Sequence, residues 1–228
     1  MTARPDLNVD LGELPGEPVE LFGLAHRVNV ACGGHAGDPA SMRAACRQAQ
    51  LSGALVGAHP SYPDREHFGR AEMLIVPGML RMSLEKQCRD LATIARELGV
   101  RVAHLKPHGA LYRAADRDPL LAEVVVEASR SALGEVAIVG PPEGELGRAA
   151  LRAGVPFLAE GFADRGYDRD GQLIPRGSPG SLIEDPAAAA AQAIRLAKED
   201  RFHSICVHSD TPNAILIARA VRAALDGS

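Results

Sequence analysis

Short hydrophobic runs alternate along this chain with longer amphipathic stretches, a pattern typical of an α/β protein. The runs that predict β-strands cover residues 7–11, 28–32, 54–58, 101–103 with the positions just after them, 136–139, 155–160 and 204–207. Each strand is followed by a segment that predicts a helix. A strand that returns parallel to its predecessor needs such a crossover connection, so we expect seven parallel strands with right-handed crossovers.

Helix signals fall between these strands. Asp38 is a good N-cap and Pro39 suits the first helical position, and an apolar stripe follows over residues 42–49. A second stripe over residues 84–98 ends at Gly99, a typical C-terminal cap. The remaining helices are predicted over residues 120–132, 144–153 and 186–200 and from residue 212 onward. The longest segment without such a pattern, residues 161–180, has the length of a functional lid.

Length and composition narrow the class of protein. The 228 residues suit a single α/β barrel, and no linker or repeat divides residues 1–228, so we predict one domain. A net charge of −4 and the lack of a Lys/Arg-rich run argue against nucleic acid as a partner. No segment predicts a membrane span or a secretion signal, so we expect a cytoplasmic protein. The four cysteines lack CxxC spacing, which predicts buried reduced thiols, Cys32 among them.

Polar side chains with chemical capability follow most of the predicted strands. They are Asp10, Glu13, His35, His59, Lys106, His108, Glu160, Asp164, Arg165, His208 and Asp210. Function in parallel α/β folds gathers at the carboxyl ends of the strands. Because a closed barrel would bring six of the seven strand ends around one mouth, we favour a barrel over an open sheet.

Two chemistries suit these side chains. Asp10, His35 and His59 could hold a divalent metal that lowers the pKa of a bound water. Alternatively, His59 or His108 could transfer protons beside an orienting carboxylate such as Asp10 or Asp210.

Cationic side chains add a third capability. Lys106 could hold a carboxylate or an oxyanion, and Arg70, Arg165 or Arg176 could clamp a substrate carboxylate. The chain contains neither a P-loop motif nor a Rossmann G-x-G-x-x-G motif, so no nucleotide site is indicated.

Six motifs in this order carry a resemblance to a known family. They are DLNVDLGE from Asp6, NVACGGHAGDP from Asn29, GAHP from Gly57, KPHGALY from Lys106, EGFADRGY from Glu160 and CVHSDTP from Cys206. Together they resemble the LamB/YcsF family along nearly the whole chain. The resemblance implies a seven-stranded (β/α) barrel of the glycoside hydrolase/deacetylase type. It also implies ATP-dependent opening of 5-oxoproline to L-glutamate with companion subunits B and C. The ATP would be used by these companion subunits.

Residue roles follow from this chemistry and this resemblance. We predict Asp10, His59, Lys106, His108 and Asp210 as catalytic residues. We predict Glu13, His35, Arg70, Tyr112, Glu160, Asp164, Arg165 and His208 as substrate-binding residues, and Asp10, His35 and His59 as candidate metal ligands.

Departures from the family pattern bear on substrate detail rather than on the reaction class. They are Val9 where Cys is usual, Gly34 where an aromatic residue is usual, Arg113 where Asn often follows the tyrosine, Ser209 where Gly is usual, and a shortened segment over residues 14–27.

Two rival functions share this scaffold. One is a metal-dependent amidase or carbohydrate deacetylase that needs no ATP. The other is a non-catalytic subunit that binds a lactam and presents it to its partners.

Overall fold

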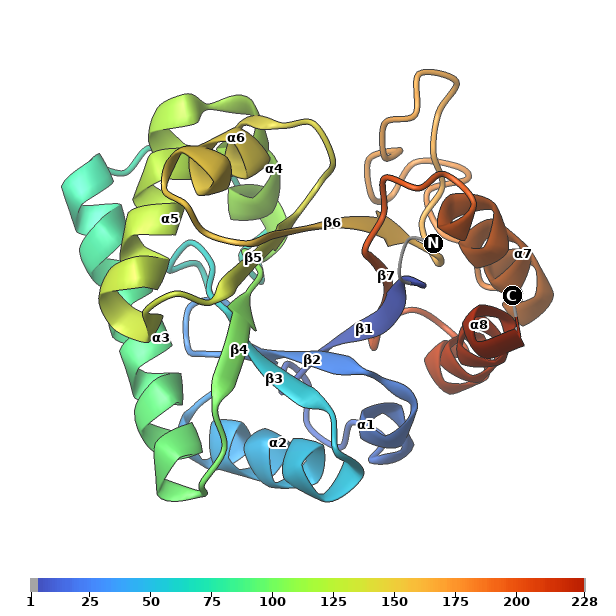
Figure 1. The fold of residues 1–228 in the computed structure, drawn as a ribbon, viewed down its shortest axis with the longest axis horizontal. Helices are drawn as coiled ribbons and strands as arrows, with labels where there is room; N and C mark the ends of the chain where they lie inside the picture. The colour runs from blue at the N-terminus through green and yellow to red at the C-terminus, as the bar shows by residue number, and fades with distance from the viewer. Residues whose placement is uncertain (1–3, 228) are drawn as a thin grey trace.

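The computed structural model describes residues 4–227, and its strands form one closed parallel barrel (Figure 1). The strands pair in chain order, and β7 pairs with β1 to close the ring. They are β1 (Asp6–Leu11), β2 (Arg27–Ala31), β3 (Leu55–His59), β4 (Val102–Leu105), β5 (Ala137–Gly140), β6 (Phe157–Phe162) and β7 (Ser204–His208). The predicted seven-stranded (β/α) barrel is therefore confirmed. Residues 1–3 and 228 of the predicted single domain lie outside the described residues.

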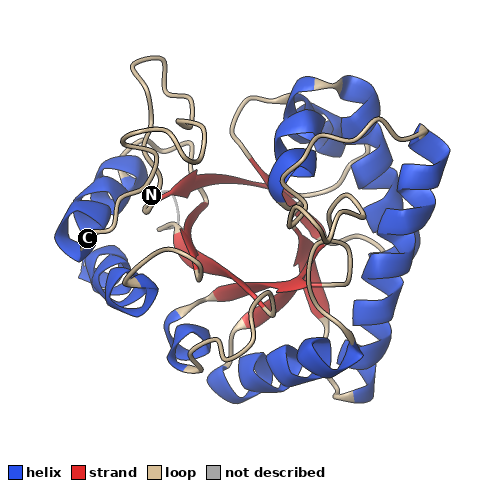
Figure 2. Cartoon of the chain, turned by 180° about the vertical axis from the view of Figure 1, so that it is seen from behind, coloured by secondary structure: helices blue, strands red, loops and turns tan. Residues whose placement is uncertain are grey.

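Helices surround the ring of strands on its outside (Figure 2). They are α1 (Glu20–Leu24), α2 (Pro39–Ser52), α3 (Pro77–Glu97), α4 (Gly109–Arg117), α5 (Pro119–Leu133), α6 (Glu145–Arg152), α7 (Pro186–Ala197) and α8 (Ala214–Gly227). Asp38 caps α2 as predicted, accepting a hydrogen bond from the backbone N–H of Ser41. No helix among residues 4–227 is long and apolar enough to cross a membrane.

Two helices were not anticipated from the sequence. The short helix α1 lies in the segment between β1 and β2. Helix α4 begins at Gly109 inside the KPHGALY motif and ends just before Asp118, whose carboxylate caps the next helix, α5, by accepting from the N–H groups of Leu120 and Leu121. The Asp118–Pro119 pair repeats the Asp38–Pro39 signal, so the boundary between α4 and α5 was present in the sequence.

The alternation along the strands places polar side chains inside the barrel and apolar side chains outside. In β1, the side chains of Asn8 and Asp10 reach Lys106 across the barrel, whereas Leu7, Val9 and Leu11 are buried in the layer between strands and helices. This outer layer forms one continuous hydrophobic core with the inner faces of the helices. The barrel interior is thereby left free to hold polar and charged groups.

The long loop between β6 and α7, residues 163–185, is fixed by local hydrogen bonds. Arg165 donates from Nε to the carbonyl of Ser181 (3.0 Å) and from Nη2 to the carbonyl of Ile174 (2.7 Å). The side-chain amide of Gln192 on α7 donates to the carbonyls of Phe162 and Arg165, each at 2.7 Å. These bonds hold the loop over the barrel end at which β6 finishes.

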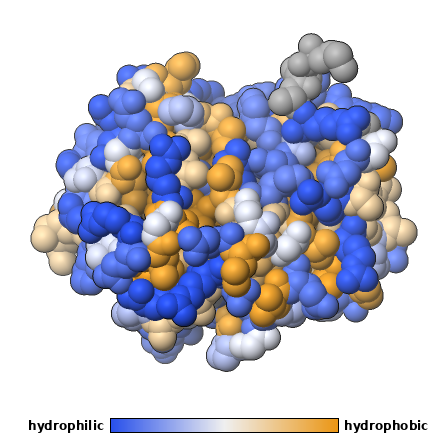
Figure 3. Space-filling view, turned by 60° about the horizontal axis from the view of Figure 1, so that its bottom comes forward, coloured by the Kyte–Doolittle hydropathy of each residue, from blue (hydrophilic) through white to orange (hydrophobic). Residues whose placement is uncertain are grey.

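The surface outside the barrel mouth mixes residue types. Figure 3 shows hydrophobic residues reaching the surface at several places between hydrophilic ones.

The four cysteines are buried and unpaired, as predicted.

Close packing inside the barrel explains one glycine. A Cβ atom on Gly57 of β3 would overlap the buried imidazole of His104 on the neighbouring strand β4. We expect Gly57→Ala to lower the free energy of unfolding by about 1–3 kcal/mol through overpacking. Gly78→Ala in α3, where the new methyl group has open space, should be neutral or slightly stabilising. Urea unfolding of the two variants checks this, and equal stabilities would contradict it.

Candidate functional site

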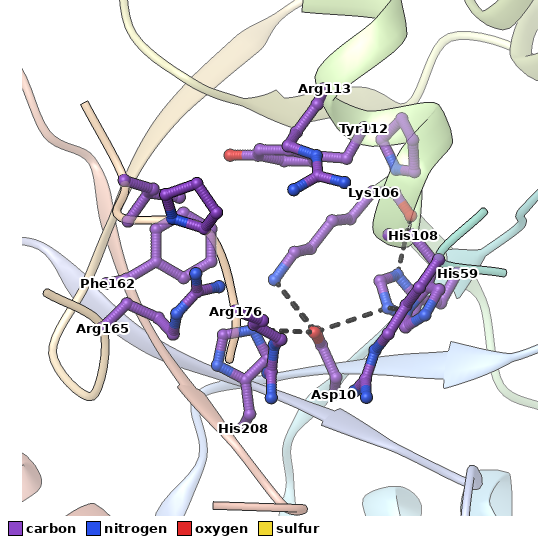
Figure 4. A pocket seen from close by; sticks show the side chains of 15 residues that line it. Asp10, His59, Lys106, His108, Tyr112, Arg113, Phe162, Arg165, Arg176 and His208 are labelled. Atoms are coloured by element: carbon purple, nitrogen blue, oxygen red, sulfur yellow. Dashed lines mark hydrogen bonds and ion pairs between the residues drawn. The ribbon is translucent and has the colours of Figure 1, made fainter. Parts of the chain in front are cut away.

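A cavity of about 450 Å³ opens at the carboxyl ends of the strands. Asp10, His59, Lys106, His108 and His208 form its floor (Figure 4). Its walls and rim are formed by Tyr112, Arg113, Phe162, Leu173, Pro175, Arg165, Arg70 and Arg176. The side chains come from β1, β3, β6 and β7, from helix α4 and from the loops after β3, β4 and β6.

Asp10 occupies the centre of the floor and is nearly fully buried. Its Oδ1 atom accepts from Lys106 Nζ at 3.0 Å and from the side-chain amide of Asn29 at 2.7 Å. Its Oδ2 atom lies 3.4 Å from His59 Nε2 and 3.9 Å from His208 Nε2. One carboxylate oxygen is thus fixed by the barrel interior, while the other is directed toward the two histidines.

Lys106 brings together the polar groups at the barrel centre. Its Nζ atom lies 3.1 Å from Glu160 Oε2 and 3.1 Å from Cys206 Sγ, in addition to its contact with Asp10. Although burial alone would lower the pKa of Lys106, Asp10 and the other neighbours hold it well above its ordinary value. A permanent ammonium therefore lies at the floor of the cavity.

Beneath Asp10, a buried histidine fixes the chain of hydrogen bonds. The His104 Nε2 atom lies 2.8 Å from the side-chain oxygen of Asn29. Because an amide oxygen can only accept, Nε2 carries the hydrogen and donates it to Asn29. The amide group of Asn29 is thereby turned so that its N–H groups donate to Asp10 and Asn8. Burial lowers the pKa of His104 to about 3, so the ring stays neutral.

Four side chains form a second group beside Asp10: Glu13, His35, His59 and His108, whose ligand atoms all lie within 4.8 Å of one another. Glu13 Oε1 lies 2.8 Å from His35 Nε2, 3.2 Å from His108 Nδ1 and 3.6 Å from His59 Nε2. The rings of His35 and His108 stack at 3.6 Å. We name these four residues the Glu13–His cluster.

Backbone carbonyl groups determine which nitrogens carry hydrogen in this cluster. His59 Nδ1 donates to the carbonyl of Lys106 (2.8 Å), and His108 Nε2 donates to the carbonyl of Phe68 (3.0 Å), because a carbonyl oxygen can only accept. The other two ring nitrogens, His59 Nε2 and His108 Nδ1, face each other at 3.0 Å. Two lone pairs repel at this distance, so the arrangement requires a proton or another cation between them.

The pKa values fit a proton on His59. Burial alone would lower the pKa of His59, but Asp10 and Glu13 raise it above its ordinary value. Likewise, burial alone would raise the pKa of Asp10, but His59 and Lys106 hold it well below its usual range. Burial lowers the pKa of His108, and it lowers that of His35 to about 4. In the absence of a metal, the floor therefore contains an Asp10–His59 ion pair beside neutral His108.

His208 is oriented by a buried carboxylate. Asp164 accepts from the His208 backbone N–H (2.9 Å), from its Nδ1 atom (3.0 Å) and from the Thr211 hydroxyl (2.6 Å). The opposite nitrogen, Nε2, is left directed toward Asp10. Asp164 thus acts through His208 and does not itself line the cavity.

The remaining predicted residues lie in different places, and neither Asp210 nor Glu160 lines this cavity. Asp210 does not touch the buried floor: it pairs with Arg70 at 2.5 Å and with Arg176 at 3.3 Å on the rim. Arg165 is committed to the carbonyls of the 163–185 loop. Tyr112 lies edge-on to Phe162, and both also line a neighbouring cavity of about 540 Å³ that Glu160 reaches.

The structure brings most of the predicted site residues together, but in a different grouping. Of the three candidate metal ligands, His35 and His59 belong to the Glu13–His cluster, whereas Asp10 groups with Cys206 and His208. The contact between Cys206 and Lys106 was not anticipated from the sequence. The sequence did contain an indication of it: Cys206 lies two residues from both Ser204 and His208 in β7, so the three side chains share one face of the strand. Burial raises the pKa of Cys206 well above its ordinary value, so it is a neutral thiol rather than a nucleophile.

Arg113 and Phe162 were also missed. Both fall within or next to the recognised motifs. The side chain of Arg113 is oriented by helix α4, and that of Phe162 by its place as the last residue of β6. The hydrophobic pattern predicted neither that helix nor that strand end.

Comparison with known proteins agrees with this architecture. The family model described as LamB/YcsF matches residues 5–228. A protein from Methylococcus capsulatus that is named as the A subunit of 5-oxoprolinase is 41% identical over 239 residues, covering 97% of this chain and 92% of that protein. The crystal structure of a lactam utilization protein from Thermus thermophilus is 37% identical, with a TM-score of 0.91 over 99% of this chain and 97% of that one.

A more distant likeness concerns the fold alone. A family 30 endoxylanase from Clostridium papyrosolvens is 11% identical, with a TM-score of 0.56 over 98% of this chain and 72% of that chain. The barrel architecture is therefore shared with glycoside hydrolases.

The neutral, buried His104 predicts a dependence of stability on pH. Its pKa of about 3 in the folded protein lies below its ordinary value of 6.5. Between these values the unfolded chain binds a proton that the folded chain does not, so stability falls as the pH is lowered from 7 toward 3. Because His35 and His108 also have lowered pKa values, we expect His104→Gln to reduce this dependence without abolishing it, in urea unfolding measured at several pH values.

The matched control for this prediction is His67→Gln. His67 is exposed and pairs with Asp64, which raises its pKa, so its removal should leave the acid-side loss of stability in place. If His104→Gln loses as much stability on acidification as the unsubstituted chain, the assignment to His104 is wrong.

Proposed function

The chain belongs to the LamB/YcsF family, and we propose that it is the A subunit of an ATP-dependent 5-oxoprolinase that opens the lactam ring of 5-oxoproline to give L-glutamate. The observation that carries this proposal is the position of Asp10, which contacts the ammonium of Lys106 on one side and His59 on the other. A carboxylate, an acid and a fixed positive charge at the floor of one cavity are the groups that amide hydrolysis needs.

Ring opening breaks one C–N bond. The oxygen of a water molecule bonds to the carbonyl carbon, the ring nitrogen leaves with a proton, and the products are a carboxylate and an amine within one molecule. Because a five-membered lactam is an unstrained amide, the carbonyl needs activation before water attacks it. We propose that ATP supplies this activation and that companion subunits B and C bind it. The support is that this sequence has no P-loop or Rossmann motif.

The floor residues divide the proton transfers. Asp10 Oδ2 faces the cavity and orients the attacking water, because Oδ1 is already held by Lys106 and Asn29. His59, which Asp10 and Glu13 keep protonated, gives its Nε2 proton to the leaving nitrogen. Neutral His108 takes up at its free Nδ1 atom the proton that the attacking water loses and passes it to His59 Nε2, 3.0 Å away, which restores the acid. His208, oriented by Asp164, binds the same water or the product carboxylate.

Lys106 stabilises the negative charge that develops on the carbonyl oxygen. Its ammonium already contacts Asp10, Glu160 and Cys206, so it also keeps the floor carboxylates aligned. Asp210 serves a different purpose in this proposal from the one expected from the sequence: it holds Arg70 and Arg176 at the rim. The cytoplasmic location expected from the sequence stays a prediction.

The reaction can be tested with the three proteins of the proposed assembly. Glutamate and phosphate should form from 5-oxoproline and ATP when this chain and both companion subunits are present, and not when any one is omitted. His59→Gln and His108→Gln should each lower the rate by about 10²–10⁴-fold, the usual contribution of a general acid or base. His67→Gln, an exposed histidine, is the control. Full activity in both floor variants, with unchanged melting temperatures, would contradict the assigned roles.

A specific observation favours a second candidate, a metal-dependent amidase. In the Glu13–His cluster, His59 and His108 each give their second ring N–H to a backbone carbonyl, as metal-ligating histidines usually do, and their free nitrogens converge beside Glu13 Oε1. Three imidazoles and one carboxylate suit Zn²⁺ or a similar divalent ion. Such an ion would lower the pKa of water and polarise a carbonyl group. Glu13, His59 and His108 would bind it, and His35 would orient Glu13 through its 2.8 Å hydrogen bond.

Metal content separates the two candidate functions. If the cluster is a metal site, the purified chain should bind about one Zn²⁺ by elemental analysis, and saturating Zn²⁺ should raise its melting temperature, because a ligand that binds only the folded state stabilises it. Glu13→Gln and His59→Gln should abolish both effects, whereas His67→Gln should not. Amide hydrolysis by the metal-loaded chain without ATP would replace the first proposal with the second. If the chain binds no metal, the cation between His59 and His108 is a proton.

A further inference from the structure

The cavity contains one guanidinium that no carboxylate or carbonyl group engages among residues 4–227, that of Arg113. Arg113 is the middle residue of α4, and Figure 4 shows its guanidinium turned into the cavity, drawn above Lys106. The other three arginines that line the cavity already have carboxylate or carbonyl partners. Arg70 and Arg176 pair with Asp210, and Arg165 donates to the carbonyls of Ser181 and Ile174.

The walls and rim of the cavity therefore carry an excess of positive charge. Burial lowers the pKa of Arg165, and the neighbouring guanidinium groups of Arg176 and Arg113 lower it further, against the opposite effect of Asp164. Arg165 is thus repelled by both Arg176 and Arg113, and Arg113 itself has no carboxylate partner among residues 4–227. A bound anion at Arg113 would offset this repulsion and could form two parallel hydrogen bonds with the planar guanidinium.

The floor has the opposite character. Three carboxylates, those of Asp10, Glu13 and Glu160, lie among the side chains at the floor. The one ammonium at the floor, Lys106, already contacts Asp10 and Glu160. A carboxylate on the substrate would be repelled from this floor and attracted to the walls and rim. A lactam that bears a carboxylate thus has one orientation in which its amide faces Asp10 and His59.

We propose that Arg113 binds the carboxylate of the substrate and makes this cavity select cyclic amides that carry a free carboxylate over neutral lactams of the same ring size. This inference rests on the proposed ring-opening function and assigns its substrate specificity to one residue. Arg113 acts by holding and orienting the substrate, and takes no part in proton transfer.

The test compares two ligands that differ only in the carboxylate. When this chain is assembled with both companion proteins, Arg113→Gln should lower kcat/KM for 5-oxoproline about 30-fold, mainly through a higher KM. The inhibition constant of 2-pyrrolidinone, the same ring without the carboxylate, should change less than about twofold. Arg113→Lys, which keeps the charge without the planar fork, should fall between the two. Arg130→Gln removes an exposed guanidinium from α5 and serves as the control.

The outcomes separate this inference from the function on which it rests. If the unsubstituted assembly does not open 5-oxoproline, the proposed function fails and the inference falls with it. If the unsubstituted assembly is active and Arg113→Gln leaves the KM for 5-oxoproline unchanged, the proposed function stands and the inference is wrong. Equal weakening of 5-oxoproline and 2-pyrrolidinone would also overturn it, because a loss that ignores the carboxylate indicates a change of cavity shape. Melting temperatures show whether each variant is folded.

Discussion

The ion pair between Lys106 and Asp10 is the interaction on which the barrel interior depends. Burying a charged group without a partner is costly, and here one ammonium serves Asp10 and Glu160 together. With Glu13, three carboxylates share this one ammonium, and the facing nitrogens of His59 and His108 show where a second cation must lie. The same electrostatic requirement therefore stabilises the fold and prepares the site, since the cation that offsets part of this negative charge is also the proton or metal that amide hydrolysis uses.

Much of the architecture was predictable because it depends on local patterns. Alternating polar residues such as Asn8 and Asp10 mark a strand, and a capping residue such as Asp38 marks the start of a helix. The strands, most helices and the barrel topology could therefore be predicted from the sequence. Alternation alone does not say which face of a strand is the interior. In this barrel the polar face is inside, and the apolar face is covered by helices. The decisive clue was that the polar positions continue beyond the strand ends, into Glu13, Lys106 and His108.

The pairing of the site residues was less predictable, because it depends on contacts between segments distant in sequence. That Asp10 and Asp210 are both carboxylates near strand ends suggested similar roles. The register places Asp10 opposite Asn29 and His208 inside the ring, while Asp210 lies beyond β7, where Arg70 and Arg176 reach it. Likewise, the tautomers of His59 and His108 are set by carbonyl groups that no sequence motif encodes.

The separation of charge between the floor and the walls of the cavity explains how one small site can both bind an acidic substrate and catalyse its hydrolysis. An anionic floor would repel an acidic substrate if it acted alone, and a cationic wall would hold the substrate without chemistry. The barrel places the floor at its strands, since β1 and β3 hold Asp10 and His59 and Lys106 directly follows β4. It places the wall on α4 and on the 163–185 loop, which can differ between relatives without disturbing the strands. Reaction chemistry is thereby tied to the most constrained part of the fold, and substrate choice to the part that tolerates change, which is why Arg113 is a reasonable place for specificity to reside.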